Sequence, residues 1–104
     1  MVTPVPIERV VEQGLPIPRS AAVGVGPLGR QQLVVVLEDS AAPAGLADAA
    51  RTAKVRSLVE HPVAAVLSVA ALPVDIRHNA KIDRASVARW ADDVLAGRRA
   101  RPPR

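Results

Sequence analysis

Aromatic residues are almost absent from this 104-residue chain: Trp90 is the single one, and there is no Phe or Tyr. Hydrophobic residues still make up 49% of the sequence, so the core must be built from Val, Leu, Ile and Ala. These side chains each bury less apolar area than an aromatic ring, and we therefore expect a domain of modest stability. The length is that of a single domain.

Cysteine is also missing, which excludes disulfides, thiolate chemistry and thiolate metal sites. The histidines and carboxylates show no metal-ligand spacing, so we expect no metal site. There is no Walker-type loop and no Ser/His/Asp pattern with a specific spacing. The longest apolar run, residues 62–74, is too short to span a bilayer, and the N-terminus does not resemble a signal peptide. We expect a cytoplasmic protein that does not contact a membrane.

The net charge of +4 arises from the end of the chain, where Arg98, Arg99, Arg101 and Arg104 fall within seven residues. A basic tail can bind nucleic acid, but no aromatic side chains alternate with these arginines to stack on bases. We therefore favour a solvated tail over a nucleic-acid site. The predicted organisation is a domain over residues 1–97 and a basic Pro/Arg tail or linker over residues 98–104.

The first half of the sequence predicts one helix and two strands. Thr3 can cap a helix that has Pro4 at its first position and ends at Gly14. Strands are expected over residues 20–26 and 31–38, joined by a turn that contains Pro and Gly. The second strand is apolar almost throughout, which is typical of a strand covered on both faces.

The second half predicts a helix over residues 46–60, a strand over residues 63–70, a loop and a final helix. Asp83 is a plausible N-cap of the final helix and Gly97 its end. Its apolar face follows the helical period and consists of Val87, Trp90, Ala91, Val94 and Leu95.

The order of elements is therefore helix, strand, strand, helix, strand, loop, helix. This order predicts an α+β fold with a small three-stranded antiparallel sheet flanked by about three helices. In that arrangement the third strand pairs with the first.

The loop over residues 73–84 is polar and charged, and it contains one of two lysines in a chain with twelve arginines. In so arginine-rich a chain, Lys81 suggests a task for a compact ammonium group rather than a planar guanidinium. The alternative from the residues alone is a solvated loop lysine.

At this loop the chain resembles a known family. Leu72-Pro73, followed after a charged segment by residues 79–84 (Asn-Ala-Lys-Ile-Asp-Arg), is similar to the C-terminal motif of the adenylate-forming superfamily. Most members have Gly where this chain has Ala80. Residues 74–81 (Val-Asp-Ile-Arg-His-Asn-Ala-Lys) resemble one branch most, the olefin-type β-lactone synthetases. Residues 4–11 and 20–26 resemble the first helix and first core strand of the family's C-terminal domain.

The resemblance implies a C-terminal lid domain in which Lys81 promotes acyl-adenylate formation. It also implies ATP and Mg²⁺ in the complete enzyme, bound mainly by a large N-terminal domain, and none bound by this chain alone, which we expect to be inactive in isolation. The substrate would be an acyl or β-hydroxyacyl carboxylate. Residues expected to lie near the nucleotide or to support the loop are Asp75, Arg77, His78, Asn79 and Arg84.

Two alternatives to the β-lactone synthetase hypothesis remain open. One is the C-terminal domain of a conventional acyl-CoA synthetase, which uses coenzyme A as the acceptor. The other is a free-standing interaction or regulatory domain that has kept the fold and lost the reaction.

Overall fold

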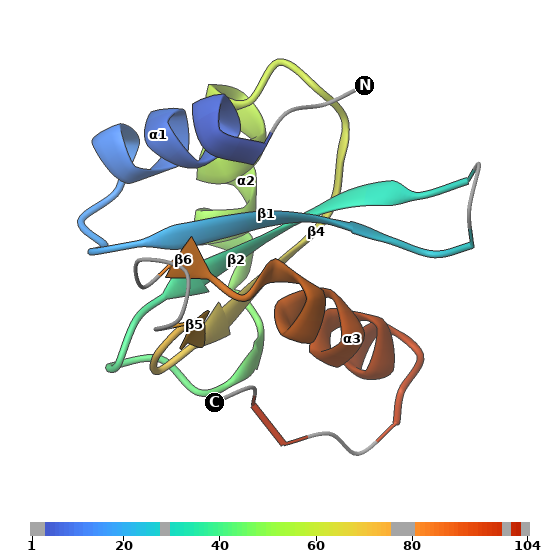
Figure 1. The fold of residues 1–104 in the computed structure, drawn as a ribbon. Coiled ribbons are helices and arrows are strands. Elements are labelled where there is room, and N and C mark those ends of the chain that lie inside the picture. Colours follow the sequence, from blue (N-terminus) through green and yellow to red (C-terminus); the bar gives the residue numbers. More distant parts are fainter. Residues whose placement is uncertain (1–3, 28–29, 76–80, 99–100, 103–104) are drawn as a thin grey trace.

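The computed structural model describes residues 4–27, 30–75, 81–98 and 101–102. A central sheet has α1 and α2 on one face and α3 on the other (Figure 1). The elements in chain order are α1 (Pro4–Gly14), β1 (Ser20–Val25), β2 (Gln32–Glu38), β3 (Gly45–Leu46), α2 (Ala49–Leu58), β4 (Val63–Val69), β5 (Val74–Asp75), β6 (Lys81–Ile82) and α3 (Arg84–Leu95). The predicted α+β class with about three helices is confirmed.

The sheet differs from the predicted one in its pairing. The strand order is β1-β2-β4-β3, and β4 runs parallel to β2 rather than beside β1. The predicted antiparallel pairing of the first two strands is confirmed, but the prediction that the third strand pairs antiparallel with the first was wrong. The connection between β2 and β4 contains α2, and such a crossover returns the chain to the end of the sheet from which a parallel strand can start. Placing the two most apolar strands side by side also lets the helices cover both of their faces.

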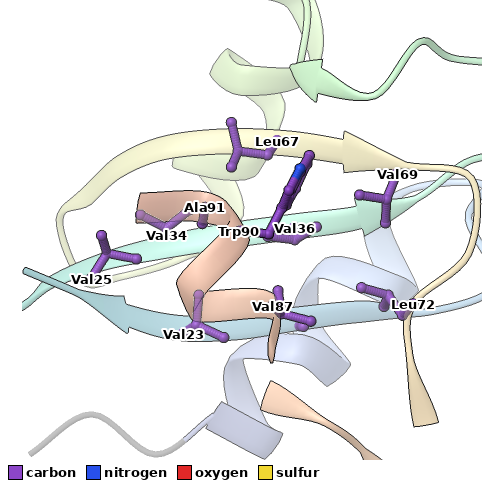
Figure 2. Close-up of a cluster of buried hydrophobic side chains, with 11 residues drawn as sticks. Val23, Val25, Val34, Val36, Leu67, Val69, Leu72, Val87, Trp90 and Ala91 are labelled. Atoms are coloured by element: carbon purple, nitrogen blue, oxygen red, sulfur yellow. The ribbon is translucent and has the colours of Figure 1, made fainter. Parts of the chain in front are cut away.

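The core is divided by the sheet into two clusters. The α3 face holds Trp90 among side chains of β2 and β4 (Figure 2). The α1/α2 face buries Val11 and Val55. Strand β2 supplies both faces, because alternate side chains of a strand point in opposite directions. Val34 and Val36 belong to the α3 cluster, and Val35 and Leu37 to the other.

Helix α3 has the ends that the sequence predicts. The Asp83 carboxylate accepts hydrogen bonds from Ser86 N at 3.2 Å and Ser86 Oγ at 2.8 Å. At the other end Gly97 has φ +77°, and its N–H donates to Val94 O at 3.1 Å. The Arg98 N–H donates to Asp93 O at 2.9 Å, which completes a Schellman motif.

Helix α2 is shorter than predicted. It begins after Asp48, whose carboxylate accepts from Arg51 N at 2.7 Å, and it ends at Leu58. The residues just before it, Gly45–Leu46, pair with β4 as strand β3. Residues 46–48 are therefore not helical despite their helical propensity, because Leu46 pairs with β4 and the Asp48 carboxylate caps the helix that follows.

Candidate functional site

Lys81 lies on a two-stranded ladder that is separate from the main sheet. Strand β5 pairs antiparallel with β6, with Asp75 opposite Lys81 and Val74 opposite Ile82. Lys81 is exposed, whereas the neighbouring Ile82 packs against the α3-side core. Because successive side chains of a strand point to opposite sides, burial of Ile82 directs Lys81 outward. Figure 1 shows this strand pair at the start of α3.

The β5–β6 pair is held at its base by two hydrogen bonds to buried structure. The backbone N–H of Leu72 donates to the Glu38 carboxylate at 2.7 Å, and Leu72 itself is buried. The Asp83 N–H donates to Pro73 O at 2.9 Å. Asp83 therefore both closes this ladder and caps α3, so the position of Lys81 is coupled to that helix.

Glu38 is a buried carboxylate that the sequence analysis did not single out. Besides the Leu72 N–H, it accepts two hydrogen bonds from the Arg19 guanidinium, at 3.1 and 3.3 Å. Its position in the sequence could have indicated a structural role, because this acidic residue follows directly after the apolar run of β2. A buried charge requires partners, and these partners join the start of β1 to the base of the β5–β6 pair.

Arg84, predicted to lie near the nucleotide or to support the loop, forms an ion pair with Glu8 of α1. Its Nε lies 2.9 Å from Glu8 Oε2 and its Nη2 lies 2.5 Å from Oε1, a bidentate arrangement. The hydrogen bonds with Glu8 raise the pKa of the Arg84 guanidinium above its ordinary value. Glu8 also accepts from the buried Ala22 N–H at 2.7 Å. The pair therefore ties α3 to α1 and to the edge strand β1.

Arg84→Ala is expected to lower the free energy of unfolding by about 1–3 kcal/mol, because Glu8 would keep its buried position without a cationic partner. This loss is smaller than the roughly 3–5 kcal/mol expected for a fully buried pair, because about a third of the Arg84 side chain is exposed and solvent screens the interaction. Urea denaturation followed by circular dichroism measures the change. Arg89→Ala, on the exposed side of the same helix, is the matched control, and an equal loss in both variants would contradict the structural role of the pair.

Asp83 adds a pH dependence to the cap of α3. Hydrogen bonds from the Ser86 side chain and backbone lower its pKa below the ordinary value of 3.8. A carboxylate with a lowered pKa stabilises the fold above its unfolded-state pKa, and this contribution is lost as the pH falls through the folded-state pKa.

We therefore expect Asp83→Asn to melt below the wild type at about pH 7 and the difference to shrink below about pH 4. Asparagine keeps an oxygen that can cap the helix but carries no charge. The substitution therefore separates the effect of ionising Asp83 from the effect of the cap itself. Thermal denaturation across the acid range gives the comparison. A melting-temperature difference independent of pH would argue against the assignment.

Of the other predicted site residues, the structure describes only the backbone of one. The backbone of Asp75 lies in β5 opposite Lys81. Arg77, His78 and Asn79 lie outside the described residues. Within the part of the chain that the structure describes, no group of three or more potential metal ligands comes together. No helix in the same part is long and apolar enough to cross a membrane.

Sequence comparison relates the chain to part of two larger proteins. It is 42% identical over 78 residues to a protein of Xanthomonas campestris pv. campestris named olefin beta-lactone synthetase, a match that covers 70% of this chain and 14% of the relative. It is 38% identical over 96 residues to a protein of the same name from Stenotrophomonas maltophilia, covering 88% of this chain and 17% of the relative. No protein-family model matches the chain. The chain thus spans about a sixth of the length of these curated relatives.

Proposed function

We propose that this chain is the C-terminal domain of an ATP-dependent carboxylate-adenylating ligase of the β-lactone synthetase type. The observation on which the proposal depends is an alignment that covers 88% of the chain, with 38% of the aligned residues identical, to part of a protein named olefin beta-lactone synthetase. The resemblance of residues 72–84 to the lysine motif of adenylate-forming enzymes agrees with it. The exposed position of Lys81 on the short β5–β6 ladder supports a role at a site formed with another domain.

In the proposed reaction, a substrate carboxylate oxygen attacks the α-phosphorus of ATP, and the bond to the pyrophosphate oxygen breaks. Negative charge increases on the oxygens around phosphorus. The Lys81 ammonium, brought near those oxygens, stabilises this charge more strongly in the transition state than in the separated reactants. ATP, Mg²⁺ and the acyl group would be bound mainly by a large N-terminal domain.

The acceptor of the activated acyl group distinguishes the two enzymatic alternatives. In a β-lactone synthetase the β-hydroxyl oxygen of the substrate attacks its own acyl-adenylate carbonyl, which closes the lactone and releases AMP. A conventional acyl-CoA synthetase would instead form a thioester with coenzyme A. The names of the relatives favour the first reaction.

Reconstitution tests this function. The matching N-terminal domain is assayed for pyrophosphate release with ATP, Mg²⁺ and a β-hydroxy acid, with and without this chain. We expect release to rise strongly when the chain is added and a β-lactone to form without coenzyme A. Product formation that requires coenzyme A would assign the domain to the acyl-CoA synthetase class. Binding of the chain without any rise in pyrophosphate release would favour a regulatory domain and contradict the proposal.

A further inference from the structure

A cavity of about 410 Å³ lies where the parallel strands β2 and β4 end, next to the N-terminus of α2. Lys81 and the β5–β6 pair are not among its lining residues, and the inference is independent of the function proposed above. Ligands of parallel α/β arrangements commonly bind beyond the carboxyl ends of the strands. The residues lining the cavity that bear on its chemistry are Asp39, Pro43, Leu46, Asp48, Arg51 and Ser68.

Two buried polar atoms in this cavity have no hydrogen-bond partner among the described residues. They are Ser68 Oγ and Arg51 Nη1. Ser68 is 1% exposed. Its neighbours Leu67 and Val69 belong to the α3-side core, so the Ser68 side chain points to the opposite face, where Arg51 also lies. Buried polar groups in native proteins are normally paired. The Ser68 hydroxyl can both donate and accept, whereas Arg51 Nη1 can only donate, so an acceptor oxygen that enters the cavity would serve both atoms.

The charges around these donors argue against an anion. Arg51 Nη1 lies 2.7 Å from Asp39 Oδ2, an ion pair without hydrogen-bond geometry. Asp48 adds a second carboxylate, which accepts from the Arg51 N–H. Two carboxylates and one guanidinium therefore line the cavity. Each carboxylate can accept further hydrogen bonds. The ligand group that fits these residues best is therefore neutral and has both an acceptor oxygen and a donor hydrogen.

The rim of the cavity is apolar. Leu46 is 67% exposed, and Pro43 and Ala41 beside it are exposed as well. A volume of about 410 Å³ lies at the small end of the range for ligand sites. We propose that this cavity binds a small neutral molecule with a secondary amide and a short alkyl group. The amide carbonyl accepts from Ser68 and Arg51, the amide N–H donates to a carboxylate, and the alkyl group lies on Leu46.

The test uses the 104-residue chain and N-butylacetamide as the probe, followed by two-dimensional NMR of the backbone amides. We expect saturable shifts confined to the cavity residues, with a dissociation constant on the order of 1–10 mM for so small a ligand. Butyrate has a similar alkyl length but an anionic head, and we expect weaker binding. No saturable shift, or binding of butyrate as tight as that of the amide, would overturn the proposal.

Ser68→Ala is expected to weaken amide binding by about threefold or more, the loss typical of one hydrogen bond. Its melting temperature should stay equal or rise, because an unpaired buried hydroxyl is removed.

Ser57→Ala is the control. It removes an exposed hydroxyl of α2 that donates to Lys54 O and should leave binding unchanged. Leu46→Ala, at an exposed site, should weaken the probe through its alkyl group. Unchanged binding in Ser68→Ala, or a marked loss of its stability, would refute the site.

Discussion

Lys81→Ala in the reconstituted enzyme is expected to slow acyl-adenylate formation by about 100–1,000-fold, the usual cost of removing one group that stabilises transition-state charge. The substitution is at an exposed position, so the fold and its stability should not change. The measurement is ATP-dependent pyrophosphate release under saturating substrate. Because the interaction forms mainly in the transition state, we expect the loss in kcat rather than in KM.

The chain contains its own control for this experiment. Lys54 is the second lysine, exposed on α2, and Lys54→Ala should leave the rate within about twofold of the wild type, as expected for a surface charge. Lys81→Arg should recover little of the activity, because a planar guanidinium does not match a compact ammonium in size or reach. Equal rates for Lys81→Ala and Lys54→Ala would eliminate the catalytic role.

Trp90→Ala is expected to lower the free energy of unfolding by about 3–5 kcal/mol, the range for removing a large buried aromatic side chain. Trp90 is 4% exposed and lies in the α3-side cluster among Val36, Leu67 and Val69 (Figure 2). The remaining core consists of aliphatic side chains, which cannot move far enough to fill the volume of an indole. Urea denaturation monitored by far-ultraviolet circular dichroism provides the measurement.

Leu95→Ala serves as the matched control on the same helix. The sequence period places Leu95 on the apolar face with Trp90, but the structure leaves it 41% exposed. Its removal should therefore cost less than about 1 kcal/mol, as expected for a surface position. A comparable loss in both variants would mean that α3 packs over a different face from the one described.

Local signals in the sequence were sufficient for the ends of α1 and α3 and for the positions of β1, β2 and β4. Pro4 and Gly14 bound α1 as predicted, because proline suits a helix start and glycine a helix end. Asp83 and Gly97 mark the ends of α3 through contacts within a few residues. Each of these features depends on neighbours close along the chain, which sequence patterns describe well.

The partners of the buried carboxylates were not predictable in the same way. Glu8 and Glu38 bond to Arg84 and to Leu72, respectively, across long stretches of chain. Nothing in the local pattern identifies those partners, although an acidic residue on the apolar face of α1 or directly after an apolar strand indicates that some partner is needed. Arg84 is an example: its ion pair with Glu8 joins the start of α3 to α1, which lies on the opposite face of the sheet.

The sequence by itself determined the α+β class and the caps of α3, and it marked Lys81 as a rare lysine in a polar segment, because these follow from residue types and short-range periodicity. Only the tertiary structure decided that β4 pairs in parallel with β2, that Glu38 and Asp83 hold the β5–β6 pair, and that Ser68 and Arg51 meet in one cavity. Strand order and the pairing of buried polar groups depend on which distant segments bury their apolar faces together. The free energy of that arrangement is the sum over the whole core, so no short stretch of sequence specifies it.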